Sequence, residues 1–347
     1  MILNIILFII ILGFIVLVHE GGHFFFAKMT GVHVFEFSIG MGPVVFKKIA
    51  KDKTQYSIRA FPIGGFVSLA GEDPSEEVRE ETKGKNLQDK TVFQRFLVMF
   101  AGVFNNFVSA FLILIIAGIL LGAPSTKPYV SGVKENSPAE EVGIKTGDLI
   151  TNINGHKIKY RDDIALYLAV EDLSKPLNIS VENNGIKKDL TLNAKKEKKY
   201  GKERYIIGVE LNPKKEGGFI NSVKYAYNEF FAIIKQMYVV IINLFTGGVH
   251  LNELSGPVGI YSVVGQMSKE GITALLYLTA LLSINVGVIN LLPFPAFDGG
   301  RILFLIIEKI KGKPVDPKIE NTIHSIGFIL LMILMIYVTF NDILKLF

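Results

Sequence analysis

The sequence contains no cysteine. This absence excludes disulfide bonds, thiol nucleophiles and thiolate ligands for a metal ion. Charged residues make up only 20% of the 347 positions, and the lysines are not interleaved with aromatic residues, so nothing indicates nucleic-acid binding. No lysine or arginine precedes Lys28, and no small-residue cleavage site follows the first apolar run, which argues against a removable signal peptide.

Half of the residues are hydrophobic, and the mean hydropathy of +0.40 is too high for an ordinary soluble domain. We predict a multi-pass α-helical membrane protein with about four transmembrane helices, at residues 1–27, 96–122, 274–300 and 323–340. Within residues 219–267 we predict an amphipathic helix over 219–247 that lies at the membrane surface, followed by a turn-rich connector. A fifth span over 219–247 is the alternative.

Residues 28–95 separate the first two predicted spans. Between His33 and Leu69 they are rich in β-branched and aromatic residues punctuated by glycine, which predicts a β-hairpin or small sheet. This region is apolar but too short for a domain, so we expect it to associate with the membrane. Strand edges cannot face lipid, so it would pack on protein or line a wet cavity. The charged stretch from Glu72 to Lys90 is predicted to be a mobile, solvated loop.

Residues 125–211 change character, because charges return and hydrophobic residues alternate in short runs. The pattern predicts an α+β module with strands at 130–133, 149–153, 177–181, 188–192 and 206–209 and helices at 139–142 and 162–169. The run from Ser137 to Gly155 closely resembles the core of a PDZ domain. That resemblance implies a groove for an extended peptide at a sheet edge. An occluded groove, with the module acting as a spacer or filter, is the alternative.

The chain reads His-Glu-Gly-Gly-His from His19 to His23, at the end of the first apolar run. His19 and His23 lie four residues apart, so on a helix they project from one face and can bind one zinc ion. Glu20 can then take a proton from a zinc-bound water. Ionisable groups are costly at this membrane depth, which favours a functional site. A buried polar cluster that holds helices together is the alternative.

A catalytic zinc site usually has three protein ligands and one water. Asp298 is the strongest third candidate, because it ends the third span just after two prolines that free backbone groups. Its alternative role is the N-cap of a helix that starts at Gly299. No motif supports the remaining histidines, which we expect to be ordinary surface or core residues: His33, His156, His250 and His324.

The distribution of lysine and arginine predicts the topology. Residues 28–95 hold eleven of them and residues 301–318 hold five, whereas residues 1–4 and 341–347 together hold one. The positive-inside rule therefore places both connectors in the cytoplasm and both termini outside. His23 and Asp298 then reach the same depth near the cytoplasmic face, and the module at 125–211 lies outside the cytoplasm. We expect the protein in a bacterial cytoplasmic membrane.

Together these motifs resemble the site-2 protease family of intramembrane zinc metalloproteases, and most closely the bacterial regulator-of-sigma-E protease group. The resemblance covers nearly the whole chain and rests on these segments in order: 19–23, 61–66, 101–107, the PDZ-like module, 254–259 and 290–300. It implies Zn²⁺ held by His19, His23 and Asp298, with Glu20 as the general base. It also implies single-span membrane substrates already trimmed on their outer side, such as an anti-sigma factor, or remnant signal peptides.

The same resemblance implies that Asn290, Pro293 and Pro295 line the substrate path and that Asn106 belongs to a motif near the active site. The sequence departs from the family at two points. Val103 stands where many members have proline, which concerns how the helix begins and not the chemistry. There is room for a single PDZ domain where some members have two, which weakens a size filter built on a tandem pair.

Two other functions are compatible with the residues. A membrane-anchored PDZ scaffold with an inactive or structural metal site predicts that Glu20→Gln changes nothing measurable. A transporter predicts several intramembrane charged residues along a path. In this sequence they cluster at one depth, which favours the protease.

Overall fold

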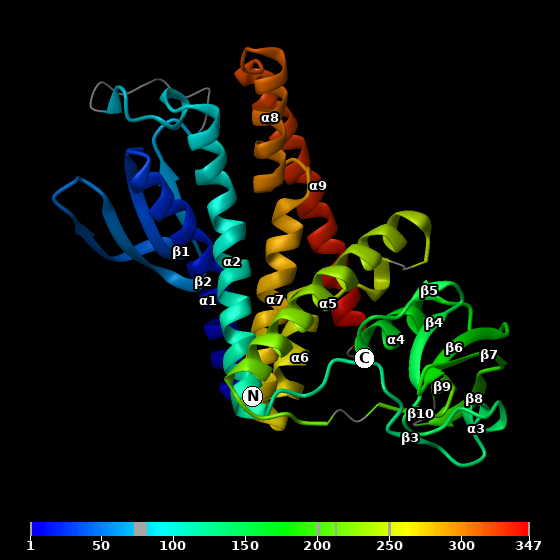
Figure 1. The fold of residues 1–347 in the computed structure, drawn as a ribbon. Helices are drawn as coiled ribbons and strands as arrows, with labels where there is room; N and C mark the ends of the chain where they lie inside the picture. Colours follow the sequence, from blue (N-terminus) through cyan, green and yellow to red (C-terminus); the bar gives the residue numbers. More distant parts are fainter. Residues whose placement is uncertain (1, 73–81, 200–201, 212–213, 249–250, 346–347) are drawn as a thin grey trace. The chain divides into compact units, whose positions relative to one another are not determined.

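A computed structural model describes the chain except at residues 1, 73–81, 200–201, 212–213, 249–250 and 346–347 (Figure 1). The chain divides into two compact units, Met1–Ile113 with Asn252–Phe347, and Leu114–Leu251. Five helices in the described part are long and apolar enough to cross a membrane: α1 (Ile2–Met29), α2 (Val92–Leu121), α5 (Phe219–Thr246), α7 (Ile272–Leu291) and α9 (Pro317–Leu344). The multi-pass helical architecture is confirmed, and α5 is the candidate beyond the four predicted spans.

The helices extend past the apolar segments that the sequence marks. α9 begins at Pro317, six residues before the predicted start, because the Asp316 side chain accepts a hydrogen bond of 2.8 Å from the Lys318 N–H. α2 begins at Val92, before the predicted start at 96. Hydropathy finds only the lipid-facing part of such helices, so the polar first turns were missed.

The predicted β-region in the first unit is confirmed as an antiparallel sheet of β1 (Val34–Ile49) and β2 (Gln55–Leu69) beside α1 (Figure 1). Both strands bend, so residues 36–39 face 65–68 on one side and 55–58 on the other. Glycines with positive φ occupy the bends, at Gly40 (86°) and Gly64 (82°). Residues 44–49 face 55–59, so the segments 65–69 and 44–49 form the two edges of the sheet.

The part of this sheet formed by Val34 and residues 67–69 packs on helices, and the edge at 44–49 does not. Val34, Val67 and Leu69 are buried with Ala27 and Val98 of the neighbouring helices. By contrast, the 44–49 edge exposes 71% of Val45 and 58% of Phe46. Near the turn between the strands, Lys28 donates a hydrogen bond of 2.6 Å to Asp52 and lowers the pKa of this carboxyl to about 2. Residues 73–81 of the predicted mobile loop lie outside the described residues.

One helix in the first unit was not predicted, and another was considered only as an alternative. The expected connector at 252–267 contains a short 3₁₀ turn (Leu251–Glu253) and then the helix α6 (Pro257–Glu270), so that prediction is wrong for most of its length. The distant carboxylate of Asp342 caps α6, because its Oδ2 accepts 2.8 Å hydrogen bonds from the N–H groups of Gly256 and Gly259. The predicted span 274–300 is also interrupted, since α7 stops at Leu291 and α8 (Asp298–Lys311) follows.

The second unit contains the predicted α+β module and α5. Its main sheet has the strand order β5-β4-β6-β7, and its core includes Ile150, Ile153, Leu177 and Ile179. The elements are α3 (Pro138–Glu141), α4 (Arg161–Val170), β3 (Gly132–Val133), β4 (Leu149–Ile153), β5 (His156–Lys157), β6 (Leu177–Asn183), β7 (Ile186–Leu192), β8 (Lys195–Lys199), β9 (Lys202–Ile206) and β10 (Val209–Glu210).

One predicted strand of the module, at 206–209, is wrong. β9 ends at Ile206, Gly208 adopts a positive φ of 84°, and β10 begins at Val209 to pair with β3. The long helix α5 packs on the module through charged residues, since Lys235 Nζ lies 2.9 Å from the fully buried carboxylate of Asp163 on α4. Two of its charged residues, Glu229 and Lys235, therefore form contacts with the protein.

Candidate metal centre

His19 and His23 project from the same face of α1, as their spacing predicts. Both residues are only 9% exposed. Their Nε2 atoms lie 3.2 Å apart, and the two rings meet edge to face with centroids 4.8 Å apart. Two imidazole nitrogens at this distance without a bridging proton or cation would repel each other, so the pair is arranged to share one ion.

Asp298 completes a triangle with the two imidazoles. Its Oδ2 lies 3.2 Å from His19 Nε2 and 3.4 Å from His23 Nε2. In a tetrahedral zinc site with bonds of about 2.0–2.1 Å, two ligand atoms are separated by about 3.3 Å. Oδ2 is also buried without a hydrogen-bond partner among the described residues, a state that a bound cation would relieve. Among the described residues, His19, His23 and Asp298 are the cluster of potential metal ligands whose donor atoms lie close enough together to bind one ion.

A short irregular segment, Leu292–Phe297, brings Asp298 to this position. Ala296 has a φ of 81°, which is unfavourable for a residue other than glycine, and its N–H donates a 3.1 Å hydrogen bond to Nδ1 of His324 on α9. Asp298 is the first residue of α8, and the N-cap is Phe297, so the alternative role of Asp298 as a helix cap is wrong. A carboxylate in the first turn is still favoured by the helix dipole.

Groups around the cluster set the orientation of the rings. Nδ1 of His23 donates a 2.8 Å hydrogen bond to the carbonyl of Val98, which leaves Nε2 free to bind a metal. Nδ2 of Asn106 lies 3.3 Å from Nδ1 of His19, while its Oδ1 is buried without a hydrogen-bond partner among the described residues. Rotation of the Asn106 amide by 180° would let Oδ1 accept from the Nδ1–H of His19 and would satisfy both groups. Asn106 is itself fully buried.

α2 approaches α1 closely because Gly102 faces the two imidazoles. A Cβ atom at Gly102 would come closest to His23 Nε2 and would lie 2.7 Å from His19 Cε1. This role of Gly102 was not predicted, because its partners His19 and His23 lie about eighty residues away in the sequence. The signal was present only as a small residue in the segment 101–107.

Gly102→Ala is therefore expected to push an imidazole out of position and to lower zinc affinity by about 10- to 100-fold. Metal analysis of the purified protein measures this loss. Gly21→Ala is the matched control, because Gly21 is also helical and has no atom within 4 Å of a built Cβ. Wild-type zinc content in Gly102→Ala would show that the steric argument is wrong.

Glu20 is not part of the triangle. Its Oε2 accepts a 3.0 Å hydrogen bond from the N–H of Val67, in the 65–69 edge of the sheet. The carboxylate is therefore fixed beside the two histidines by the strand that precedes Gly71. Glu20 was expected beside the metal from its place in the motif, but its contact with the sheet joins residues 47 positions apart and has no local sequence signal.

The other predicted positions lie outside the triangle. Asn290 is half-buried in the last turn of α7, Pro293 is exposed and Pro295 is half-buried. Pro295 packs against Gly327, where a Cβ atom would collide with it. Among the histidines, His156 contacts Glu171 at 3.2 Å, His33 stacks edge to face on Phe35, and His250 lies outside the described residues.

Comparisons with known proteins agree with this geometry. The model described as Peptidase family M50 matches residues 7–334. A protein of Fusobacterium nucleatum subsp. nucleatum that carries the name of a zinc metalloprotease is 39% identical over 342 residues, which cover 98% of each chain. The regulator of sigma-W protease RasP of Bacillus subtilis (strain 168) is 33% identical over 421 positions, covering 99% of each chain. The zinc metalloprotease RasP of Geobacillus kaustophilus (strain HTA426) is 33% identical over 418 positions, covering 99% of this chain and 98% of its own.

Proposed function

Because this chain belongs to peptidase family M50, we propose that it hydrolyses peptide bonds within or near the transmembrane segments of single-span membrane proteins. The chain is a zinc metalloprotease of the site-2 type and an integral bacterial membrane protein. We assign the zinc ligands to His19, His23 and Asp298. The observation that carries this assignment is the triangle of ligand atoms with sides of 3.2, 3.2 and 3.4 Å.

When bound, zinc would acidify a water molecule and polarise the peptide carbonyl. Glu20, adjacent to His19, would take a proton from the attacking water as its oxygen adds to the peptide carbonyl carbon, and would give that proton to the amine as the C–N bond breaks. The N–H of Val67 holds the Glu20 carboxylate in place, and Val98 keeps the His23 ring in the tautomer with a free Nε2. The proline-interrupted segment before Asp298 lets a helix end, and a second one begin, at the depth of the two histidines.

Cleavage of a generic single-span substrate by the full-length chain in detergent tests this function. We expect two fragments by mass spectrometry, no fragments after a chelator has removed the metal, and recovery when stoichiometric zinc is added. Cleavage that continues in metal-free protein would contradict the proposed hydrolysis. Because one relative is named for regulation of sigma-W, we propose an anti-sigma factor trimmed on its outer side, or a remnant signal peptide, as the physiological substrate class.

We propose that the substrate unwinds and pairs with the 65–69 edge of the sheet. This edge is adjacent to Glu20, because the N–H of Val67 points away from β1 and reaches the Glu20 carboxylate. The segment 55–59 is a poorer candidate, since it has β1 residues on both sides. An extended peptide exposes its carbonyl groups, whereas a helix keeps them hydrogen-bonded, so edge pairing would present the scissile bond to the base.

Val67→Pro removes an N–H that lies in this edge and also holds the Glu20 carboxylate, so it is expected to slow cleavage at least ten-fold with zinc content unchanged. A slower rate fits either role of the N–H, whereas an unchanged rate excludes both. Val45→Pro is the matched control on the opposite edge, since Val45 has no partner in the described register. The cleavage rates of both variants, measured with the same single-span substrate, test the role of the 65–69 edge. Equal rates in the two variants would rule out pairing at the 65–69 edge.

We propose that α5 lies at the membrane surface and that α1 and α7 cross in parallel. At one end Ser268, just before α7, donates to Asn4 at 3.4 Å, and at the other end His23 faces Asp298. α2 returns the chain across the membrane once between them, and α6 is too short to span. If α5 also crossed the membrane, α7 would run antiparallel to α1, contrary to these contacts. With the positive connectors inside, the metal centre lies toward the cytoplasm and the α+β module outside.

We also propose that the module is a single PDZ domain with a peptide groove. A cavity of about 280 Å³ lies between β10 and the end of α4, lined by Leu168, Leu173, Ile207 and Val209. An apolar cavity beside a strand edge suits an extended peptide.

A further inference from the structure

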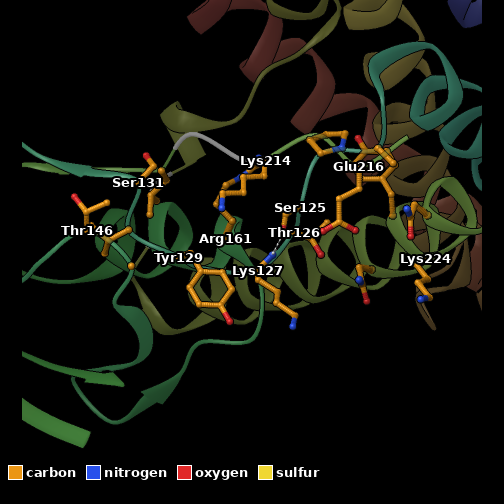
Figure 2. Close-up of a pocket in the computed structure, with 18 residues that line it drawn as sticks. Ser125, Thr126, Lys127, Tyr129, Ser131, Thr146, Arg161, Lys214, Glu216 and Lys224 are labelled. Carbon is orange, nitrogen blue, oxygen red and sulfur yellow. Dashed lines mark hydrogen bonds between the residues drawn. The ribbon is translucent and has the colours of Figure 1, made fainter. Parts of the chain in front are cut away.

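A second, larger cavity lies within the second unit, between the segment that follows α2, the segment that precedes α5, and the module (Figure 2). Its volume is about 670 Å³, within the range of small-ligand sites. It contains none of the residues assigned to peptide hydrolysis or to the PDZ groove. Its lining therefore calls for a separate explanation.

The cavity is positively charged. Lys127, Lys214 and Lys224 line it (Figure 2), and their Nζ atoms form no ion pair or hydrogen bond within the described part of the chain. Glu216 is the acidic residue in the lining. Arg161 also faces the cavity, and its charge is partly balanced by Asp162 at 3.0 Å and Glu229 at 3.7 Å. The balance favours an anionic ligand.

Two largely buried residues add hydroxyl groups that are open to the cavity. Thr126 is 7% exposed and Tyr225 is 5% exposed, and both line the cavity. Neither hydroxyl has a hydrogen-bond partner among the described residues, and neither is sealed from the cavity. Both hydroxyls are therefore accessible from the cavity and can form hydrogen bonds with a ligand or with water.

The place of the cavity in the chain indicates the kind of anionic ligand. Thr126 and Lys127 follow within six residues of Leu121, where the membrane-spanning helix α2 ends, and Lys224 lies in the first two turns of the apolar helix α5. In the proposed topology, in which α2 crosses the membrane and α5 lies at its surface, the cavity lies at the depth of the lipid headgroups. Phe219 and Ile220 at the start of α5 are 67% and 70% exposed and can contact acyl chains. We infer that this cavity binds the phosphate-bearing headgroup of an anionic phospholipid.

Native mass spectrometry of the full-length chain, titrated with phosphatidylglycerol or phosphatidylcholine in detergent, tests this inference. We expect saturable binding of one phosphatidylglycerol and at least ten-fold weaker binding of phosphatidylcholine. Lys127→Gln combined with Lys224→Gln should weaken phosphatidylglycerol binding by about five-fold for each charge removed. Lys188→Gln combined with Lys195→Gln is the charge-matched control on exposed strands of the same unit and should bind as the wild type does.

Thr126→Val distinguishes a specific lipid site from nonspecific electrostatic attraction of anionic lipid to the surface. It keeps the charge of the cavity and removes one hydroxyl. We expect it to weaken phosphatidylglycerol binding about ten-fold, with Thr126→Ser restoring it and with cleavage of a detergent-solubilised substrate unchanged. Full binding in Thr126→Val, or equal losses in the two double-lysine variants, would overturn the inference. Inorganic phosphate that competes at the same concentration as phosphatidylglycerol would assign the cavity to a free anion instead of a lipid.

Discussion

Glu20→Gln is expected to lower the rate of peptide cleavage by about 10²–10⁴-fold, the usual contribution of a positioned general base, while bound zinc stays at the wild-type level. The two effects separate because Glu20 lies outside the ligand triangle. Its carboxylate accepts the Val67 N–H, and the carbonyl oxygen of glutamine can accept the same hydrogen bond. The substitution therefore removes the base and keeps the packing of α1 against the sheet.

The measurement pairs single-turnover cleavage of a single-span substrate with zinc analysis of the same preparation. Unchanged cleavage in Glu20→Gln would contradict the role of Glu20 as general base. Absence of cleavage in both proteins would favour the alternative of an inactive or structural metal site. Loss of zinc together with cleavage would show that Glu20 is a ligand, contrary to the observed geometry.

Asp298→Ala has the second largest expected effect, because it removes a ligand and not the base. Zinc affinity should fall by about 100-fold or more, and cleavage should be lost in parallel. Two buried imidazoles remain 3.2 Å apart in this variant, too few ligands for a catalytic zinc site. Asp298→Asn should retain part of the affinity, since its amide oxygen is a weaker ligand.

Zinc titration of the purified variants, monitored with a competing chromophoric chelator, measures these affinities. Asp316→Ala is the matched control, because Asp316 is a carboxylate in the same unit that caps α9 and does not face the histidines. Zinc affinity in Asp298→Ala equal to that of the control would exclude Asp298 as a ligand.

The sequence was sufficient for the part of the centre that depends on local spacing. His19 and His23 share a face because they are four residues apart on one helix, and Asp298 stands out as a carboxylate beside prolines in an apolar segment. The surrounding contacts join residues far apart in sequence: Asn106 with His19, Val98 with His23, and His324 with Ala296. No local pattern encodes such pairs, so they became visible only in the fold.

The same distinction explains the errors in the fold. Long apolar runs mark the spans by their length, and alternation marks the strands, so most of these elements were predicted. α6 and α8 are short and begin at glycine- and proline-rich segments that resemble turns. α6 is capped by Asp342, more than eighty residues away, and its first turn is therefore stabilised by a group that the local sequence does not contain.

The most direct test of the account is the identity of the atoms that bind zinc. X-ray absorption at the zinc edge of the purified full-length chain should show one zinc ion with two imidazole nitrogens and light oxygen ligands at about 2.0–2.1 Å. In Asp298→Ala this spectrum should disappear or lose one oxygen ligand. Absence of zinc from the wild type, or a site with three or more imidazoles, would contradict the assignment of His19, His23 and Asp298.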